Sequence, residues 1–470
     1  MNKSHTEIIV IGAGPGGYAA AFTAADHGKK VVLVDMDPRL GGVCLNRGCI
    51  PSKALLNAVH IKEKAAHAKA FGLQFEAPKL DLDALRNWKN DIITKLSDGV
   101  SMLASKRGVT VIRGKGYFES NTTLRVETET GQLFFTFDHA IIAVGSRPTI
   151  PAAFDLGSKR VMTSTEALEI EEIPATLLVV GGGYIGMELG TVYAGLGSAV
   201  TVVEAGPGIL SGADADLARP VIKYANTHFK ALYTQTKITK MATHDKQIKV
   251  TLEGENAPKE LHFDKVLVSI GRTPNSKDLG LENANIKVDE KGFIQVNKQQ
   301  QTSQANIWAI GDIAGGLLLA HKASKEAKIA VEALLGSRVE FNHQVPAVVF
   351  THPEIAWCGL TESEAKAQNI PVKVAKFPWG ASGRAMTLQQ TEGLTKLIID
   401  PQTDRILGAG IVGEGAGELI GEAVLAIEMG ANATDLAETI HAHPTLSETL
   451  MESAEVFFGT STHLYSPKKG

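Results

Sequence analysis

Residues 8–35 read IIVIGAGPGGYAAAFTAADHGKKVVLVD, and residues 177–204 read LLVVGGGYIGMELGTVYAGLGSAVTVVE. Each stretch predicts a short apolar strand, a G-x-G-x-x-G turn, an apolar helix, a glycine and a second apolar strand that ends in an acidic residue. In both copies the first glycine of the turn precedes that acid by 23 residues. Set between a strand and a helix at this spacing, the motif predicts a dinucleotide-binding βαβ unit, present twice.

The three glycines of each turn have separate tasks in such a unit. The first makes the tight turn, the second lets the backbone approach a pyrophosphate, and the third allows close packing of helix on strand. The helix N-terminus directs its dipole at the phosphates, and the terminal acid is placed for ribose hydroxyls. The residues in these positions are Gly12, Gly14, Gly17 and Asp35 in the first copy, and Gly181, Gly183, Gly186 and Glu204 in the second.

The residues after Glu204 indicate which nicotinamide cofactor the second unit prefers. Ala205, Gly206 and Pro207 follow it, so neither arginine nor lysine stands there. A 2′-phosphate would therefore meet a carboxylate and no cation. The second unit is predicted to prefer NAD over NADP.

A cysteine motif, GGVCLNRGCIPSK at residues 41–53, begins six residues after the first unit ends. It contains Cys44 and Cys49, two of the chain's three cysteines. In an ideal helix, residues five apart have Cα atoms about 8.7 Å apart. A disulfide needs about 4.4–6.8 Å, so a bridge requires a bent or overwound helix. Gly48 and Pro51 supply the means to bend it.

The spacing alone is compatible with more than one role for the two cysteines. Two unpaired cysteines packed as small hydrophobic residues, or half of a metal site, would show the same pattern. A zinc site built on cysteine lacks partners, because the only other cysteine is Cys358. The position beside a dinucleotide unit favours a redox pair, since a strained, locally closed disulfide is easily reduced. Two dinucleotide units with such a pair between them indicate a flavin in the first unit and a nicotinamide cofactor in the second.

Composition limits the class of protein. The 470 residues are enough for about three domains. The 44% hydrophobic content describes a soluble globular protein, and the net charge of −4 gives no reason to expect a nucleic-acid partner. Three cysteines and an N-terminus without a signal or transit pattern predict a cytoplasmic location. The apolar run 177–203 is interrupted by glycines and Glu188, so we expect a buried βα unit there and no membrane association.

Together these motifs resemble those of the pyridine nucleotide-disulfide oxidoreductase family, and the resemblance covers essentially the whole chain. Further matches are GRTPN at 271–275, AIGD at 309–312, LAHK at 319–322 and HAHPTLSE at 441–448. The resemblance implies an α/β protein with two Rossmann-like domains and a C-terminal α+β dimerisation domain. The implied boundaries are 1–148 for FAD, 149–274 for NAD, 275–341 completing the FAD domain, and 342–470 for dimerisation.

The resemblance also implies an activity and partners. Within the family, the motifs are most similar to those of flavoproteins that oxidise protein-bound dihydrolipoamide to lipoamide, with FAD as bound cofactor and NAD+ as electron acceptor. Such a protein would be a homodimer in a 2-oxo acid dehydrogenase complex, with the lipoyl domain of an acyltransferase as its partner.

Individual residues receive roles from the same resemblance. Cys44 would be the thiol that exchanges with substrate, and Cys49 the thiol that faces the flavin. His443 would be the base and Glu448 the carboxylate that orients it, both acting on the flavin and disulfide of the other subunit. The remaining positions would contact the cofactors: Lys53 near the reactive flavin nitrogen, Asp312 on the ribityl chain, Ala320 and His321 through their backbone, Gly116 and Ile238 at the adenines of FAD and NAD, and Gly145, Gly271 and Arg272.

Some of these positions fit a second role as well. Thr445-x-x-Glu448 has the pattern of a capping box that opens the final helix, which would account for Glu448 without catalysis. The two roles are compatible, because a carboxylate has two oxygens.

Tyr184, in the second Gly-rich turn, departs from the pattern of many lipoamide enzymes. They carry an aliphatic residue at this position, whereas glutathione reductase carries a tyrosine.

Rival functions predict features that the sequence lacks. Glutathione or trypanothione reductase would show basic residues after Glu204, and mercuric reductase a C-terminal cysteine pair. A flavoprotein retained as a binding subunit, with an idle redox centre, is an alternative from a different class. The intact cysteine pair and His443 argue against it.

Overall fold

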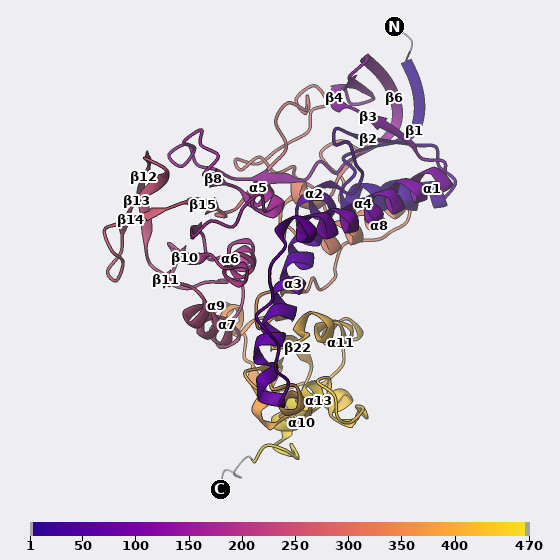
Figure 1. The fold of residues 1–470 in the computed structure, drawn as a ribbon. Helices are drawn as coiled ribbons and strands as arrows, with labels where there is room; N and C mark the ends of the chain where they lie inside the picture. Colours follow the sequence, from indigo (N-terminus) through magenta and orange to yellow (C-terminus); the bar gives the residue numbers. More distant parts are fainter. Residues whose placement is uncertain (1–2, 466–470) are drawn as a thin grey trace.

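The structure is a computed structural model that describes residues 3–465. Its N-terminal part folds around a seven-stranded sheet (Figure 1), parallel in the first βα unit and antiparallel along one edge. The order is β3 (Thr110–Arg113), β2 (Val31–Asp35), β1 (Lys3–Ile11), β6 (Gly131–Ile142), β5 (Thr123–Thr128) and β4 (Lys115–Ser120), with β17 (Ile307–Ala309) also paired with β6. Strand β6 joins the two halves, because β5 pairs with its beginning and β17 with its end.

Helices α1 (Pro15–Asp26) and α8 (Ala320–Leu334) pack against each other beside this sheet, although they lie far apart in the sequence. Their approach is close because both helices contribute alanines to one buried cluster, including Ala20 and Ala327. The chain therefore returns to the first unit after it has completed the second.

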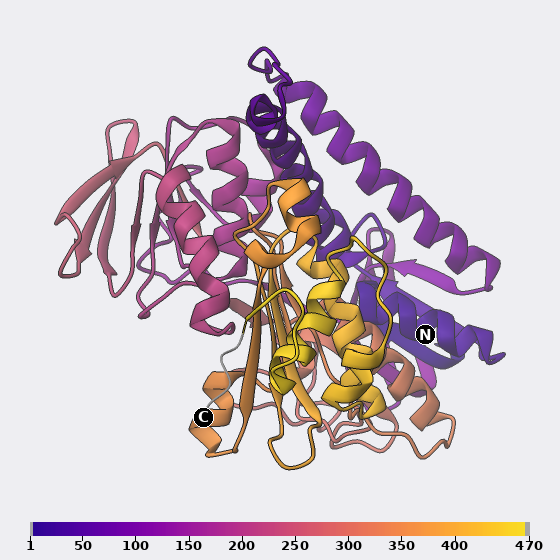
Figure 2. The same ribbon diagram turned by 90° about the horizontal axis from the view of Figure 1, so that it is seen from below.

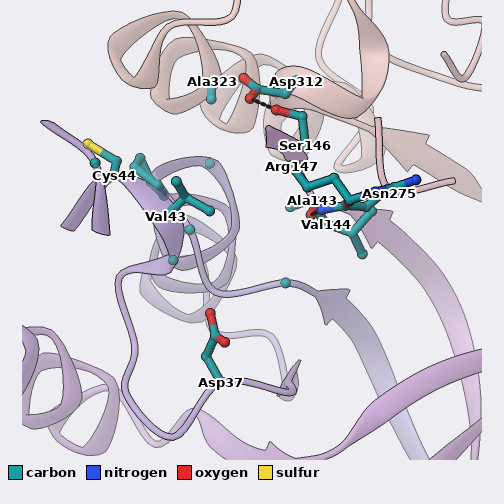
Figure 3. Close-up of a pocket in the computed structure, with 18 of the residues that line it drawn as sticks. Asp37, Val43, Cys44, Ala143, Val144, Ser146, Arg147, Asn275, Asp312 and Ala323 are labelled. Atoms are coloured by element: carbon teal, nitrogen blue, oxygen red, sulfur yellow. Dashed lines mark hydrogen bonds between the residues drawn. The ribbon is translucent and has the colours of Figure 1, made fainter. Parts of the chain in front are cut away.

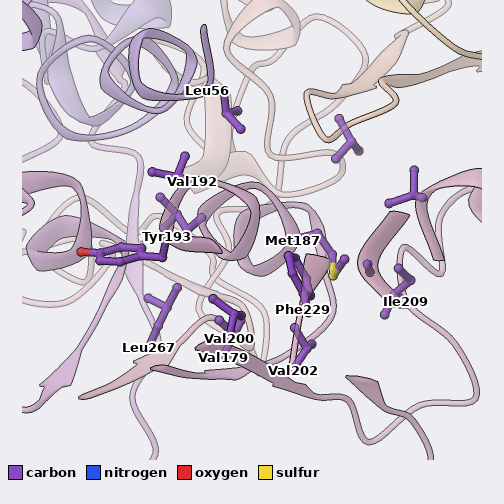
Figure 4. Packing of buried hydrophobic residues seen from close by; sticks show 14 of the residues in the cluster. Leu56, Val179, Met187, Val192, Tyr193, Val200, Val202, Ile209, Phe229 and Leu267 are labelled. Atoms are coloured by element: carbon purple, nitrogen blue, oxygen red, sulfur yellow. The ribbon is translucent and has the colours of Figure 1, made fainter. Parts of the chain in front are cut away.

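The second βα unit forms a parallel sheet of five strands: β11 (Ala231–Tyr233), β10 (Ala199–Val203), β9 (Thr176–Val180), β15 (Lys265–Val268) and β8 (Val161–Met162). Helix α6 (Tyr184–Leu196) packs on it, and Figure 4 shows Met187 and Tyr193 of this helix in one cluster with Val179 and Val200 of the strands. A second, antiparallel sheet packs against the other face through a separate cluster. Its strands are β12 (Lys237–His244), β13 (Gln247–Glu253) and β14 (Glu260–Phe263).

Both Gly-rich turns have the geometry that their glycines predict. Gly12 and Gly181 have φ angles of 99° and 101°, a left-handed backbone that glycine adopts without strain. A Cβ atom on Gly17 would lie 1.7 Å from the Gly12 carbonyl oxygen, and one on Gly186 would lie 2.1 Å from that of Gly181. Helix–strand packing therefore excludes any side chain at Gly17 and Gly186.

The cysteine motif forms α2 (Gly42–Arg47) and the first turn of α3 (Cys49–His67), and α4 (Leu82–Lys106) returns alongside α3 (Figure 2). Helix α3 also packs on α6, where a Cβ on Gly195 would lie 2.2 Å from the Val59 side chain. The helix that carries Cys49 is therefore held tightly against the second unit.

The chain passes into the second unit and back at one place. Strands β7 (Ser146–Pro148) and β16 (Arg272–Pro274) pair antiparallel where the chain passes into and out of the second unit. Helix α5 (Ser164–Glu169) follows the first crossing, and Thr163 and Glu166 form its capping box. The crossing point fixes the two nucleotide units relative to each other.

The C-terminal part has an antiparallel sheet covered by helices, which confirms its predicted α+β character. The sheet order is β18 (Ala347–Val349), β19 (Ile355–Gly359), β22 (Ile406–Val412), β21 (Leu394–Ile399) and β20 (Lys373–Pro378). The helices are α9 (Glu362–Gln368), α10 (Gly383–Leu388), α11 (Ala416–Met429), α12 (Ala433–Glu438) and α13 (Glu448–Phe458). Helices α11, α12 and α13 share one buried cluster with the sheet.

A buried lysine attaches the second unit to this C-terminal part. The Lys396 side chain of β21 is 1% exposed, and its Nζ lies 2.7 Å from Asp214, 2.8 Å from Asp216 and 2.7 Å from Glu362. The two aspartates stand at the start of α7 (Ala215–His228) in the second unit. These three carboxylates lie close enough to hold a metal ion, but they already pair with the ammonium groups of Lys396 and Lys376.

The apolar run 177–203 forms β9, α6 and β10, as predicted. Most of the α6 side chains are buried against neighbouring elements. Among residues 3–465, no helix has both the length and the apolar character needed to cross a membrane.

The two turn glycines of the second unit predict different outcomes for the same substitution. Gly186→Ala should destabilise the protein by about 1–3 kcal/mol, because its Cβ would overlap the Gly181 carbonyl oxygen. Gly183→Ala is the matched control, since a Cβ there meets no atom within 4 Å. Thermal unfolding should show a lower Tm for Gly186→Ala alone. Equal Tm values for the two variants would contradict the packing described for α6.

Candidate functional site

A cavity of about 530 Å³ opens between the first unit, the cysteine helices and the start of α6. Figure 3 shows Cys44 and Asp312 among the residues that line it. Its volume lies within the range of ligand pockets, about 300–1,000 Å³. The predicted site residues that line it are Gly12, Gly14, Asp35, Cys44, Cys49, Lys53, Gly116, Gly145, Arg272, Asp312 and Ala320. The structure thus brings together eleven positions that the sequence spreads from Gly12 to Ala320.

The other predicted positions lie elsewhere. Gly17 packs behind its turn, and the imidazole of His321 bonds to the Pro346 carbonyl at 2.7 Å. Ile238 is half-buried on β12. Two further groups also lie outside this cavity. They are the positions of the second unit and its end, Gly181, Gly183, Gly186, Glu204 and Gly271, and the C-terminal pair, His443 and Glu448.

The first Gly-rich turn fits the phosphates of a dinucleotide. Gly14 is the N-cap of α1, no side chain bonds to the first N–H groups of that helix, and Pro15 follows. A Cβ on Gly14 would have only one neighbouring atom, 4.0 Å away on Gly42. The free N–H groups and the helix dipole therefore face an open space that suits a pyrophosphate.

The acids at the ends of β2 and β10 are held in the same way. Asp35 accepts hydrogen bonds from the N–H groups of Ala13 and Asp37, and burial raises the pKa of Asp35 although both donors oppose it. Glu204 accepts at 2.7 Å from the N–H of Gly182 and at 2.5 Å from that of Gly206. Each acid thus braces its own turn, while lone pairs remain for a ribose hydroxyl.

Asp312, in the 3₁₀ turn η2 (Gly311–Ala314), is oriented by the crossing between the units. The Ser146 hydroxyl donates to the Asp312 carboxylate, as the dashed line in Figure 3 shows. Arg272 donates from Nε to the Ser146 hydroxyl and from Nη2 to the Ser146 carbonyl, both at 2.7 Å. The Arg272 Nε atom also lies 3.6 Å from Asp312 Oδ2. Sequence reasoning named the arginine and the aspartate but missed the serine between them.

The predicted bend in the cysteine helix is a complete break. Helix α2 ends at Arg47 and α3 begins at Cys49, and Gly48 between them has φ −146° and ψ −114°. A Cβ on Gly48 would lie 2.8 Å from the Val43 carbonyl oxygen. Cys44 and Cys49 are free thiols in this structure, and their sulfurs share a hydrogen bond. The break brings together two cysteines that a continuous helix would separate.

The two thiols differ in acidity. The hydrogen bond from Cys44 lowers the pKa of Cys49 most, burial opposes it, and the Lys53 ammonium lowers it further, to about 7. Cys49 is also the first residue of α3, where the helix dipole favours a thiolate. The same hydrogen bond, together with burial, raises the pKa of Cys44. In the reduced pair, Cys49 is therefore the more acidic thiol.

Glu188 is a functional residue that sequence reasoning missed. Its side chain is 4% exposed and accepts from Lys53 Nζ and Ser52 Oγ, both at 2.8 Å, and from the Phe350 N–H at 3.0 Å. The Lys53 ammonium also lies 4.7 Å from the centre of the Phe350 ring. Glu188 is the only charged residue of the apolar helix α6, and that anomaly was the available signal. Tyr184, one turn earlier, lines the cavity with its side chain partly exposed.

His443 and Glu448 form a hydrogen-bonded pair. His443 Nδ1 donates to Glu448 Oε1 at 2.8 Å, which leaves Nε2 free to accept a proton. Glu448 Oε2 accepts from the Thr445 N–H at 2.7 Å. Burial opposes ionisation of Glu448, but the Thr445 N–H and His443 outweigh it, so the pKa of Glu448 is lowered.

Only half of the predicted capping box is present. Helix α13 begins at Glu448, and the Thr445 hydroxyl donates to the Ala442 carbonyl at 2.7 Å instead of capping the helix. One carboxylate oxygen of Glu448 therefore holds the loop backbone, and the other holds the imidazole. The His443 side chain is 70% exposed and lies outside the cavity, so one chain does not bring it to the thiols.

Two family profiles match the sequence. Residues 6–327 match pyridine nucleotide-disulphide oxidoreductase, and residues 345–454 match the dimerisation domain of pyridine nucleotide-disulphide oxidoreductase. Among similar proteins, the dihydrolipoyl dehydrogenase of Vibrio cholerae is 46% identical over 464 residues, which cover 98% of each chain. That of Haemophilus influenzae is 45% identical over 465 residues, 98% of this chain and 97% of the relative.

Solved structures show the same architecture. LpdA from Mycobacterium tuberculosis superimposes with a TM-score of 0.89 at 26% identity, covering 96% of this chain and 99% of that one. The HOCl-induced flavoprotein disulfide reductase RclA from Escherichia coli, in its Cu(II) complex, gives a TM-score of 0.87 at 29% identity, covering 97% and 100%. The match extends through both nucleotide units and the C-terminal part.

We expect two charges near Cys49 to shift its acidity in opposite directions. The Lys53 ammonium lowers the pKa of Cys49 and the Glu188 carboxylate raises it. In the reduced protein, Lys53→Met should therefore raise that pKa and slow alkylation by iodoacetamide at pH 7, by up to about tenfold for one pKa unit. Glu188→Gln should lower the pKa and speed the reaction. The pH dependence of labelling, assigned to Cys49 by peptide mapping, measures both, and a shift in the same direction would contradict the charge arrangement around this thiol.

Proposed function

The chain belongs to the pyridine nucleotide-disulphide oxidoreductase family, and we propose that within it the protein is a dihydrolipoyl dehydrogenase, which oxidises dihydrolipoamide to lipoamide with NAD+ as the electron acceptor. It is a flavoprotein that uses FAD and NAD. The observation that carries the proposal is the Cys44–Cys49 pair, one sulfur protonated and the other acidic, in the wall of a cavity whose turn suits a dinucleotide.

The proposed exchange follows from the different acidities of the two sulfurs. His443 takes a proton from one substrate thiol, and the resulting thiolate attacks Cys44 in the oxidised pair. The Cys44–Cys49 bond breaks, and Cys49 leaves as a thiolate, which its lowered pKa favours. The second substrate thiol then attacks the mixed disulfide, so that lipoamide is released and the Cys44 sulfur takes a proton. The electron pair of the substrate now resides in the cysteine pair.

FAD, when bound in the cavity, supplies the path by which this electron pair passes to NAD+ as a hydride. The groups suited to hold FAD are the first Gly-rich turn, Asp35, Asp312 and Arg272, which lies where the chain returns from the second unit. Lys53, held by Glu188, places an ammonium group on the same wall as Cys49. The chain's contribution is to position these groups and to set their charge.

The second unit is proposed to bind NAD. Gly183 has open space where its Cβ would stand, as a close approach by a pyrophosphate requires. Glu204 accepts a hydrogen bond from the Gly182 N–H of its own turn. The next residues are Ala205, Gly206 and Pro207, none of which carries a positive charge. These features support NAD over NADP.

The protein is a homodimer, with residues 345–454 as its dimerisation domain. Its C-terminal part exposes large apolar side chains, among them Leu425 at 62%, Met429 at 77% and Ile440 at 96%. These exposed side chains lie on α11 and on the loop that carries His443, so a second subunit would cover them and receive that histidine.

As the partner of the dimer we propose the lipoyl domain of an acyltransferase in a 2-oxo acid dehydrogenase complex. A cytoplasmic location stays a prediction.

Activity assays test the substrate and the cofactor together. NAD-dependent oxidation of dihydrolipoamide should be rapid, whereas glutathione reduction with NADPH should be absent. NADP should be at least about 100-fold less effective than NAD, because a like charge beside the 2′-phosphate costs several kcal/mol. Glu204→Ser combined with Ala205→Arg should narrow that gap. Equal kcat/KM for the two cofactors in the unmodified protein would refute the assignment of the second unit.

Subunit exchange tests whether the site is shared between chains. The variants Cys44→Ser/Cys49→Ser and His443→Gln should each be inactive, and mixing them should recover part of the activity. The hybrid dimer pairs one intact cysteine pair with one intact histidine from the other chain. Exchange is followed independently with differently tagged subunits. If tagged hybrids form without activity, the site belongs to one chain and the shared arrangement is wrong.

A further inference from the structure

The loop between α12 and α13 carries His443 without support from a helix or strand. It runs from Thr439, the C-cap of α12, to Ser447, the N-cap of α13. Its side chains point mostly outward: Ile440 is 96% exposed, and the His443 side chain is 70% exposed. A base on such a loop needs anchors on both sides, because misplacement by about 1 Å costs about a hundredfold in rate.

The anchor on the C-terminal side is the group already described. Thr445 bonds to the Ala442 carbonyl through its hydroxyl and to Glu448 through its N–H. Leu446 packs against the buried cluster of the C-terminal part. This anchor begins two residues after His443.

A second histidine forms the anchor on the N-terminal side. The His441 side chain is only 5% exposed. Its Nδ1 lies 2.8 Å from the Thr439 carbonyl oxygen, and its Nε2 lies 2.7 Å from Oε1 of Glu422 on α11. Both ring nitrogens thus lie within hydrogen-bond distance of an oxygen of the same chain, so neither is open to a substrate. In this respect it is the opposite of His443, whose Nε2 is free.

We propose that His441 and Glu422 are positioning residues for the base, because they fix the loop to α11 two residues before His443. The inference rests on the proposed function, in which His443 accepts a proton from substrate. His441 does not touch the reacting sulfur atoms. It determines where the His443 imidazole stands, and the Glu422 carboxylate determines where His441 stands.

The two half-reactions of the holoenzyme separate this role from general stability. Reduction of bound FAD by dihydrolipoamide needs His443, whereas reduction by NADH does not. His441→Ala and Glu422→Ala should slow the first by about 10–100-fold, with the second unchanged. Glu422→Gln keeps an acceptor oxygen in place and should lose far less than Glu422→Ala. Stopped-flow absorbance of the flavin measures both rates, and Tm and dimer mass are measured alongside.

The matched control is another histidine–glutamate pair, whose glutamate lies on the same helix. His343 Nδ1 lies 3.2 Å from Glu428 Oε2, and neither residue bonds to the loop that carries His443 in the part of the chain described. Glu428→Ala should leave both half-reactions at the wild-type rate. Wild-type reduction by dihydrolipoamide in His441→Ala would overturn the inference, as would an equal loss of both half-reactions or a dissociated dimer. His443→Gln distinguishes the other failure: if it reduces flavin normally with dihydrolipoamide, the proposed base itself is wrong.

Discussion

The buried carboxylate of Glu188 is the contact on which the arrangement of the site depends. It receives donors from α3 and from the strand end at Phe350, while its own helix belongs to the second nucleotide unit. A buried charge that loses a partner costs about 3–5 kcal/mol. All three parts of the chain must therefore stay in register around Glu188. The N-terminus of α3, where Cys49 stands, is fixed by the same constraint.

The two nucleotide units share one local hydrogen-bond pattern. In each, the acid at the end of the second strand accepts the N–H that follows the first glycine, so the turn and the acid are fixed together. This pattern explains why the spacing of 23 residues recurs in the sequence. The units differ in what surrounds the turn, because only the first opens on the cavity that contains the cysteine pair. Identical backbone geometry thus serves two different cofactor sites.

Local patterns in the sequence predicted most of the fold, because apolar periodicity and glycine spacing are properties of neighbouring residues. The two βα units follow from such patterns, and the α+β character of the C-terminal part followed from the resemblance to the family. What the sequence did not reveal are contacts whose partners come from distant segments. Ser146 lies between Arg272 and Asp312, and Lys396 meets carboxylates from α7 and α9.

A local pattern can also predict the wrong hydrogen bonds. Thr445 and Glu448 have the spacing of a capping box, yet helix α13 begins only at Glu448. The Thr445 hydroxyl donates to the Ala442 carbonyl within the loop and does not cap the helix. Glu448 bonds to the His443 imidazole and so supports that side chain.

The geometry also separates the paths of electrons and protons. Helix α3 is held at its start by Glu188, in its middle by the close contact of Val59 with Gly195, and farther on by the Lys64–Glu414 ion pair at 2.7 Å. The thiols at its start are therefore rigid, as electron exchange at close range with a bound cofactor requires. The proposed base, His443, stands instead on an exposed loop, where a substrate thiol could reach it. A rigid electron path and an accessible proton path are hard to build on one element. In the proposed function the base stands on another domain and is delivered by the second subunit, an arrangement that would resolve that conflict.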